Sequence, residues 1–541
     1  MPTHRVQARS PRGPATQLEH TTDPARLAAH LEDAAHVPGG HADALVVPRS
    51  EHEVAACLAG ATRVLAIGAQ SSLTGGATPR GGVLLSTANL RTLEASGSGY
   101  VRAGAGITIA EIDTWTRSQG SLYPPGPTWH GATIGGTIAT TAAGAATFKY
   151  GSTRDWVEAL TVVLATGDVL DLQRGQVTAH PDGFVEIESR RGVTRVPMPG
   201  YRMPAVPKLS AGYFSAPGMD LIDLFLGSEG TLGIVTEATL RLEQARPATC
   251  LVFVTFSERP LGLRCVNDLR NATLATWRTH DAGGLDVSAI EHMDARSLAL
   301  LREDGADRRS GMSIPADAAL GLLITLDLPA ATSSQAVYDA LGGERTDGAL
   351  GRIVELLARH GALDTAVVAP PGDTGGATRL LGLREAVPLA VNQRVGAAAR
   401  NVDARIEKTA ADVIVPFDRF ADLLSRVDDE FARRDLDGVV WGHISDGNIH
   451  PNVIPRHFAD VEAGRQAMLA IGRAAIELGG APLAEHGVGR SIIKQQLLRE
   501  LYGDDGIEQM RAVKHALDPN GVLAPGVIFP EVRSQNSEVR S

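Results

Sequence analysis

Glycine is dense between residues 60 and 240 of this chain, and one glycine-rich stretch is residues 68–76, GAQSSLTGG. That segment directly follows residues 64–67, a short apolar run typical of a strand. Consecutive backbone N–H groups in a loop of Gly, Ser and Thr can bind an anion, although composition alone is equally consistent with a flexible turn. Many other glycines fall at turns, which suits a backbone packed closely against a large flat ligand.

Helix and strand signals interleave through this first half. Ser50 with Glu53, and Thr108 with Glu111, predict capping boxes at the starts of two helices. Apolar runs on both sides of residues 166–168, TGD, predict a β-hairpin. No G-x-G-x-x-G follows a strand and no G-x-x-x-x-G-K-S/T loop occurs, so both common phosphate-binding fingerprints are absent. The pattern predicts an α+β fold.

The pattern of predicted strands and helices changes after Cys250. Strand-like runs at 251–256, 285–290 and 320–328 alternate with helical stretches, which predicts a separate α+β domain with a loop at residues 372–376. Further along, a strand at 439–441 precedes a helix of about twenty residues that ends near Gly479.

Composition excludes several classes of protein. The net charge of −11 argues against nucleic acid as a partner, because phosphate binding needs clustered Lys and Arg. The three cysteines form no C-x-x-C pair, so neither a disulfide framework nor an iron–sulfur cluster within this chain is expected. No run reaches the ~18 apolar residues of a membrane-spanning helix. The first 13 residues have the composition of a disordered basic leader, and residues 532–541 that of a disordered tail.

Histidines and a glutamate gather in two short segments near the C-terminus. His443 and His450 flank the turn-like residues 445–448, and Glu485 and His486 are adjacent in a glycine-bounded loop. Two imidazoles and a carboxylate suit a divalent metal such as zinc, iron or manganese. On these residues alone, three hydrogen-bonded polar groups without a metal are the commoner outcome.

Five segments together resemble the vanillyl-alcohol-oxidase-type FAD-binding fold and occur in that family's order. They are residues 68–76, 123–128 (YPPGPT), 133–136 (TIGG), 149–151 (KYG) with Arg154, and 227–236 (GSEGTLGIVT). The C-terminal segments narrow the resemblance to the glycolate oxidase/D-lactate dehydrogenase branch, over about residues 40 to 530. It implies an extension at 1–40, expected to be partly disordered, and a two-subdomain PCMH-type FAD-binding domain at 41–246. A ferredoxin-like α+β cap domain at 247–480 follows, and residues 481–531 return to the FAD domain.

The resemblance also implies which residues hold FAD. The cradle for the pyrophosphate would be Gly68, Ala69, Gln70, Ser71, Ser72, Leu73 and Thr74; further along the cofactor would lie Pro125, Thr128, Thr133, Gly135, Gly136, Glu229 and Ile234. Gln70 stands where related loops commonly have glycine. The loop lacks the histidine that tethers the flavin in many relatives, and His130 is interpreted as a packing or loop residue. FAD is therefore expected to bind non-covalently.

In the metal-using members, the residues matching His443, His450 and Glu485 are ligands, and the one matching His486 is the active-site base. The expected metal is zinc, with iron or manganese as alternatives. Arg384 matches an arginine that binds the substrate carboxylate, and Asn452 matches a substrate-contacting asparagine. Lys408 lies near a substrate lysine of relatives, although its spacing differs.

The implied activity is FAD-dependent oxidation of a D-2-hydroxy acid, of the D-lactate, glycolate or D-2-hydroxyglutarate type, to the 2-oxo acid, with hydride transfer to flavin N5. Electrons would leave to a quinone, a cytochrome, an electron-transfer flavoprotein or an iron–sulfur subunit. The expected location is the cytoplasm or the membrane periphery, without a transmembrane segment, and a homodimer is compatible with the sequence. The alternatives are an FAD oxidase that uses dioxygen on another alcohol, a non-redox flavoenzyme of the alkyl-dihydroxyacetone-phosphate synthase type, and a non-catalytic binding protein.

Overall fold

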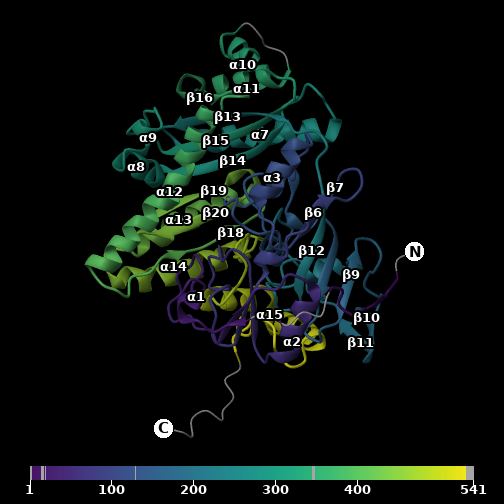
Figure 1. Cartoon of the computed structure of the whole chain (residues 1–541). Coiled ribbons are helices and arrows are strands. Elements are labelled where there is room, and N and C mark those ends of the chain that lie inside the picture. The colour runs from purple at the N-terminus through teal and green to yellow at the C-terminus, as the bar shows by residue number, and fades with distance from the viewer. Residues whose placement is uncertain (1–2, 14–17, 19, 128, 344–347, 532–541) are drawn as a thin grey trace.

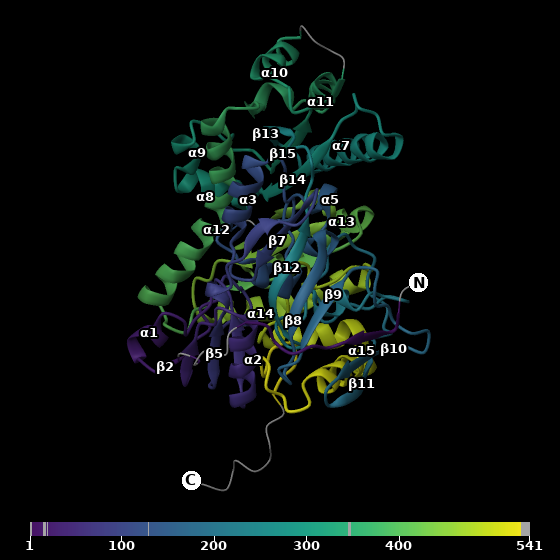
Figure 2. The same ribbon diagram turned by 45° about the vertical axis from the view of Figure 1, so that its right-hand side comes forward.

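The computed structural model describes residues 3–13, 18, 20–127, 129–343 and 348–531. The chain forms two parts, which Figures 1 and 2 show one above the other. The lower part combines the N-terminal half, coloured purple to blue, with the yellow C-terminal segment. The upper part is built from the teal and green middle of the chain. Residues distant in sequence therefore meet where the two parts join.

The lower part contains two main sheets. Their strands are β2 (His20–Thr21), β3 (Ala44–Val46), β4 (Val64–Ile67), β5 (Val83–Ser86), β6 (Leu93–Ala95), β7 (Tyr100–Gly104), β8 (Val157–Val163), β9 (Val169–Gln173) and β12 (Ile234–Arg241). The four-stranded sheet has the order β2-β3-β5-β4, and the five-stranded sheet has the order β6-β7-β12-β8-β9. β8 and β9 pair antiparallel, which confirms the hairpin predicted at residues 166–168.

The helices of this part are α1 (Pro24–Ala28), α2 (Glu51–Gly60), α3 (Ile109–Ser118), α4 (Ile134–Thr140), α5 (Thr147–Tyr150) and α6 (Ile222–Phe225). The capping box predicted before α3 is confirmed: Thr108 accepts a hydrogen bond from the Glu111 amide, and the Glu111 carboxylate accepts one from the Thr108 amide. At α2, Ser50 caps the amide of Glu53, whose carboxylate accepts a hydrogen bond from the Arg49 amide.

One large sheet organises the upper part. Its strands are β13 (Ala248–Phe256), β14 (Val287–Asp294), β15 (Leu320–Leu328), β16 (Val367–Ala369), β17 (Thr409–Ala410), β18 (Val413–Ile414), β19 (Gly438–His443) and β20 (Asn448–Val453). The order is β16-β13-β15-β14-β19-β20-β17, and β18 pairs with β20. The strands predicted at 251–256, 320–328 and 439–441 are confirmed, whereas the one predicted at 285–290 begins at Val287.

Helices cover both faces of this sheet. They are α7 (Arg259–Thr279), α8 (Ala295–Glu303), α9 (Ala306–Arg309), α10 (Ser334–Leu341), α11 (Gly348–Arg359), α12 (Thr374–Asn401), α13 (Phe420–Arg433) and α14 (Phe458–Glu477). Neighbouring residues of a strand point to opposite faces, so Val252 belongs to one apolar core and Phe253 to another. α14 is the predicted helix of about twenty residues, ending two residues before Gly479.

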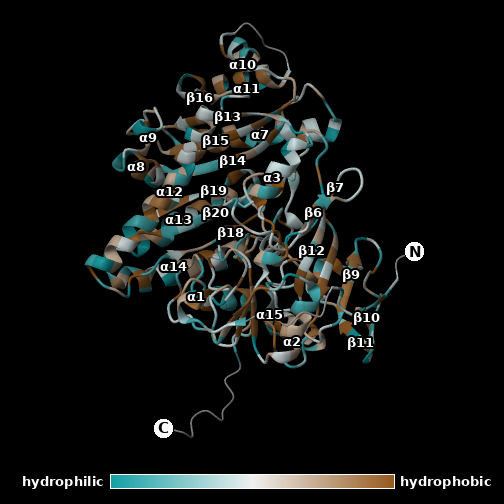
Figure 3. Ribbon diagram, in the orientation of Figure 1, coloured by the Kyte–Doolittle hydropathy of each residue, from teal (hydrophilic) through white to brown (hydrophobic). Residues whose placement is uncertain are grey.

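The C-terminal segment returns to the lower part. α15 (Ile492–Leu517) places Leu498 and Met510 in the same core as Tyr213 and Phe225. Beyond α15, Leu523 forms a β-bridge with Val64 in β4. In Figure 3 the brown, hydrophobic colour follows strands such as β9 and β12, which line this core. The α+β architecture predicted from the sequence is confirmed.

Two local predictions are wrong. β1 (Arg5–Gln7) is ordered, because it pairs in parallel with β10 (Phe184–Ser189), which also pairs with β11 (Gly192–Pro197). The leader is therefore not disordered there. Residues 374–376 open α12 instead of forming a loop, since Asp373 caps the amide of Gly376. The tail predicted at 532–541 lies outside the described residues.

Candidate active site

A tight hairpin presents the first two histidines. β19 ends at His443, the 3-10 helix η5 (Ile444–Asp446) follows, and β20 brings His450 opposite Trp441. Gly447 closes the turn with a φ of +84°, and a Cβ there would collide with the Val415 carbonyl oxygen. Only glycine fits at such a position, so the turn that brings the two imidazoles together depends on it.

The four residues predicted to act on the substrate's hydroxyl converge. His443 Nε2 lies 3.2 Å from Glu485 Oε1, and His450 Nε2 lies 3.7 Å from Glu485 Oε2. The His486 ring stacks on His450 with the ring centroids 5.4 Å apart. One ligand atom from each of His443, His450 and Glu485 lies within 4.8 Å of the others. Because zinc binds imidazole nitrogen and carboxylate oxygen at about 2.0–2.2 Å, this spacing is compatible with one shared ion.

A glutamate that the sequence analysis missed lies behind His443. Glu291, on β14, pairs in register with His443 and accepts a hydrogen bond of 2.5 Å from its Nδ1. That contact leaves Nε2 facing Glu485, the arrangement in which an outer carboxylate orients a metal-binding imidazole. Although burial alone would lower it, the Glu291 carboxylate raises the pKa of His443 to about 9.

A second missed carboxylate, Asp412, lies behind the other two histidines. Its side chain is within 3.4 Å of both His450 Nδ1 and His486 Nδ1. It also accepts hydrogen bonds from the backbone amides of Glu485 and His486, at 2.8 and 3.1 Å. Asp412, His450 and His486 could also enclose an ion by distance. We assign Asp412 to orientation instead, because both backbone amides donate to its Oδ2 and the Asn448 side-chain amide donates to its Oδ1 at 3.0 Å.

Desolvation of the His486 ring, whose side chain keeps 30% of its surface exposed, lowers its pKa to about 4 despite the opposing charge of Asp412. Its Nδ1 faces Asp412, so Nε2 is the nitrogen available to accept a proton.

Arg384 and Asn452 each keep unused polar atoms. Arg384 is buried on α12, and its Nε donates to Glu291 at 2.5 Å. No described residue accepts a hydrogen bond from its two terminal nitrogens, which leaves that end of the guanidinium able to bind a carboxylate by two parallel bonds. Asn452 donates to the His450 carbonyl, and its buried Oδ1 has no partner among the described residues. Lys408, by contrast, is exposed just before β17.

The buried charges around these histidines do not balance. The buried carboxylates are those of Glu291, Asp412, Asp446 and Glu485, and the buried cations are Lys208 and Arg384. Four carboxylates against Lys208, Arg384 and the protonated His443 leave an excess of one negative charge, and an ion that displaces the His443 proton would face an excess of two. Buried charge is costly unless it is paired or binds a metal, so this donor set fits a divalent cation.

The glycine-rich loop at residues 68–76 leaves its amides free. Within the described part of the chain, no group accepts a hydrogen bond from the amides of Ala69, Gln70, Ser71, Ser72 or Leu73. Five consecutive unpaired N–H groups are what a phosphate-binding nest requires. Gln70 has a φ of +52°, which gives a physical reason for glycine at this position in related loops. Its side chain turns away to the backbone carbonyls of His30 and Ala77.

The other residues predicted to lie along FAD occupy varied places. Thr133 caps α4 and packs against Gly68, while Gly135 and Gly136 form the first turn of that helix. A Cβ at Gly135 would meet Ala105 at 2.8 Å, so this glycine is needed for packing. Of the remaining members of this set, Pro125 is buried, Ile234 is buried in the core beside Val163, and Thr128 lies outside the described residues.

Glu229 contacts the loop that carries His486. Its carboxylate accepts hydrogen bonds of 2.8 Å from the amides of Val488 and Gly489, in the loop that carries His486. Gly489 in turn packs against Thr74, and the Arg490 amide donates to the Thr74 carbonyl. The Glu229 side chain therefore holds the His486 loop against residues 68–76, a role that the sequence analysis did not assign to it.

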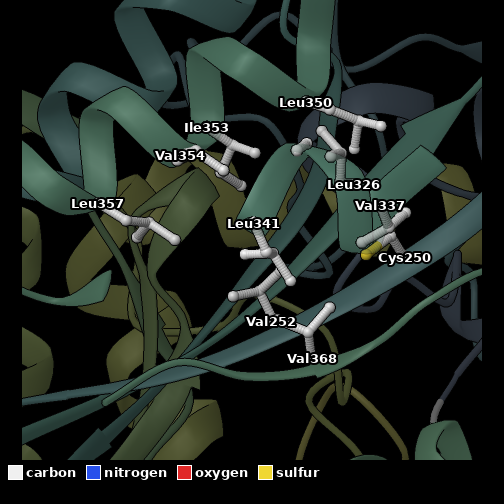
Figure 4. Close-up of a pocket in the computed structure, with 11 residues that line it drawn as sticks. Cys250, Val252, Leu326, Val337, Leu341, Leu350, Ile353, Val354, Leu357 and Val368 are labelled. Carbon is white, nitrogen blue, oxygen red and sulfur yellow. The ribbon is translucent and has the colours of Figure 1, made fainter. Parts of the chain in front are cut away.

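The upper part also has an apolar pocket, and none of the site residues described above lines it. It is enclosed by side chains such as Cys250, Val337 and Leu357 beneath α10 and α11, and Figure 4 shows only apolar groups lining it. Its volume of about 20 Å³ approaches that of a single water molecule. With no polar group to orient a ligand, it is a packing gap and not the reaction site.

Comparison with known proteins defines the class. Residues 42–173 match the family described as FAD binding domain, and residues 257–528 match the FAD linked oxidases, C-terminal domain. The chain therefore belongs to the FAD-linked oxidases and has an FAD-binding domain. Among the described residues, no helix has both the length and the apolar character needed to cross a membrane.

Particular relatives cover nearly the whole chain. It is 28% identical to a D-lactate dehydrogenase of Anaerostipes hadrus and 28% identical to the glycolate oxidase subunit GlcD of Bacillus subtilis, each over 90% of this chain and 89% of the relative. It is 27% identical to a D-2-hydroxyglutarate dehydrogenase of Xanthomonas citri, over 95% of both chains. A solved alkyldihydroxyacetonephosphate synthase shares the fold, with a TM-score of 0.60 and 17% identity over 94% of this chain and 82% of its own.

Proposed function

We propose that this protein is an FAD-dependent dehydrogenase that oxidises a small D-2-hydroxy acid to the 2-oxo acid, with FAD bound non-covalently. The observation that carries the proposal is the convergence of His443, His450, Glu485 and His486 beside Arg384. A base, a candidate metal site and a carboxylate-binding arginine are the groups that this reaction needs. Relatives named for D-lactate, glycolate and D-2-hydroxyglutarate support the substrate class.

The residues present fit both groups that the reaction requires. Residues 69–73 would hold the FAD pyrophosphate through their unpaired amides. His443, His450 and Glu485 would hold a divalent cation, and the excess of buried negative charge supports one there. When bound, FAD supplies a two-electron acceptor, and the cation lowers the pKa of a hydroxyl group.

The chain's own residues then have separate tasks. The terminal nitrogens of Arg384 bind the substrate carboxylate, which fixes the direction of the C2–H bond. His486 Nε2 accepts the proton of the substrate hydroxyl, and Asp412 stabilises the imidazolium that forms. The free Oδ1 of Asn452 offers a further acceptor beside His450.

Anaerobic flavin reduction tests the proposal. Purified, FAD-loaded protein is mixed with D- and L-forms of lactate, glycerate and 2-hydroxyglutarate and with glycolate, with and without a chelator. We expect loss of the flavin absorbance near 450 nm with D-acids or glycolate only, and slower loss after chelation. Reduction by L-acids alone, or by none of the acids, would refute the substrate class. Rapid reoxidation by dioxygen would instead identify an oxidase.

A further inference from the structure

Lys208 lies at the junction of three parts of the chain. It belongs to the segment between β11 and α6, in the lower part, and its side chain has no exposed surface. Its ammonium donates a hydrogen bond to Glu485 Oε1 and lies 3.0 Å from Asp446 Oδ2. Asp446 comes from the turn between the two histidine strands, and Glu485 from the C-terminal loop.

The contact with Glu485 matters because the same oxygen faces a histidine. Glu485 Oε1 contacts Lys208 and also lies 3.2 Å from His443 Nε2. An ammonium and a divalent cation repel each other, and both are attracted to this carboxylate. Without either cation, Asp446 and Glu485 would be buried together with no positive charge between them.

We propose that Lys208 is a positioning residue that acts as an internal cation of the active site. It holds Glu485 and Asp446 together when no ion is bound, and it opposes the ion's charge when one is bound. This inference rests on the proposed metal site of His443, His450 and Glu485. It predicts that removing the lysine's charge strengthens cation binding, a direction that simple structural damage does not produce.

The variants separate charge from shape. We expect Lys208→Met to bind Mn²⁺ about tenfold more tightly than the parent, because a repelling charge and a competitor are both lost. The uncharged Lys208→Gln should change affinity in the same direction and gives a second variant if the methionine form folds poorly. Lys208→Arg keeps the charge and should restore the parent's affinity.

Lys149 supplies a matched control. It also bridges two carboxylates, those of Asp286 and Asp327, at 2.7 and 2.8 Å, but the structure shows no contact between its ammonium and a candidate ligand. Lys149→Met removes the same charge and should leave Mn²⁺ affinity unchanged. Mn²⁺ is titrated into chelator-treated, FAD-loaded protein, and the free ion is measured by electron paramagnetic resonance.

Each outcome is decisive. The inference is supported if Lys208→Met and Lys208→Gln bind Mn²⁺ more tightly than the parent. Lys208→Arg and the control Lys149→Met should then bind it with the parent's affinity. Equal or weaker binding by Lys208→Met and Lys208→Gln overturns it, while a parent that binds Mn²⁺ leaves the proposed function standing. If only the uncharged variants bind, Lys208 replaces the ion, so the inference holds and the proposed metal role fails. If no protein binds Mn²⁺, both are wrong.

Discussion

The glycine-rich loop at residues 68–76 and the histidine cluster of His443, His450, His486 and Glu485 would bind their proposed ligands by opposite means. Residues 69–73 offer backbone amides that have no partner among the described residues, and Gln70 among them has a positive φ angle. The histidine cluster offers imidazoles from β19, β20 and the C-terminal loop, and a buried carboxylate, Glu291 or Asp412, lies beside the Nδ1 of each. Added atoms should therefore damage the first region, and removed charges the second. Glu229 and Gly489 connect the two regions.

The largest effect is expected for His486→Ala. Loss of the proton acceptor should slow flavin reduction by D-2-hydroxy acids by about 10²–10⁴-fold, the usual contribution of general base catalysis. Stopped-flow absorbance under anaerobic conditions measures the rate, and FAD content should stay at the parent level. The exposed His457 provides a control, since His457→Ala should leave the rate unchanged. An undiminished rate in His486→Ala would remove this residue from the mechanism.

Gly489→Ala tests the connection between the regions. A Cβ there would collide with Thr74, and the residue has a φ of +58°, so we expect a loss of about 3 kcal/mol in unfolding free energy and weaker FAD binding. Gly479→Ala is the control, because it has a φ of +80° but no neighbouring atom within 4 Å. Urea unfolding and flavin fluorescence measure both quantities. Equal losses in the two variants would show that contact with Thr74 is unimportant.

Arg384→Lys should act on substrate binding. The lysine keeps the charge but cannot make two parallel hydrogen bonds, so KM should rise by about tenfold, with a smaller change in kcat. Arg394→Lys on the same helix, paired with Asp304 at 2.8 Å, serves as the control. Steady-state kinetics with an artificial acceptor provide the measurement. A change confined to kcat would mean that Arg384 does not hold the carboxylate.

The last prediction concerns a histidine whose ring nitrogens make no hydrogen bond to any described residue. Neither ring nitrogen of His292, beside Glu291 on β14, has a partner within the described ranges, and burial lowers its pKa to about 3. The unfolded chain takes up this proton near pH 6.5, so stability should fall as the pH drops from about 6.5 towards 3. His292→Phe should therefore gain up to about 2 kcal/mol on the parent at pH 5 relative to pH 8. Urea unfolding at both values measures the gain, and an equal difference at both would exclude this linkage.

The cofactor loop could be predicted because its signals are adjacent in the sequence. A strand, a glycine-rich turn and a capped helix each occupy a few consecutive residues. The charged residues that contact His443 and Glu485 are different: Glu291 lies 152 residues from His443, and Lys208 lies 277 residues from Glu485. Only tertiary packing joins them. One signal was available for Glu291, a charged residue in a strand whose residues 287–293 are all buried.

Gln70 and the N-terminal segment also have contacts with residues distant in the sequence, which local composition does not predict. The sequence marked Gln70 as unusual, but only the structure gives its positive φ and its hydrogen bonds to His30 and Ala77. Likewise, the basic leader is ordered because Arg5–Gln7 finds an open edge of β10, a partner about 180 residues away. Local composition cannot show such a partner.

The central claim is that His443, His450 and Glu485 hold one divalent cation within reach of the flavin. Anomalous diffraction from crystals of FAD-loaded protein containing Mn²⁺, collected near the manganese edge, tests it directly. We expect one peak about 2.0–2.3 Å from both Nε2 atoms and a Glu485 oxygen. No peak at these three residues, or a peak bound elsewhere in a fully occupied crystal, would contradict the account.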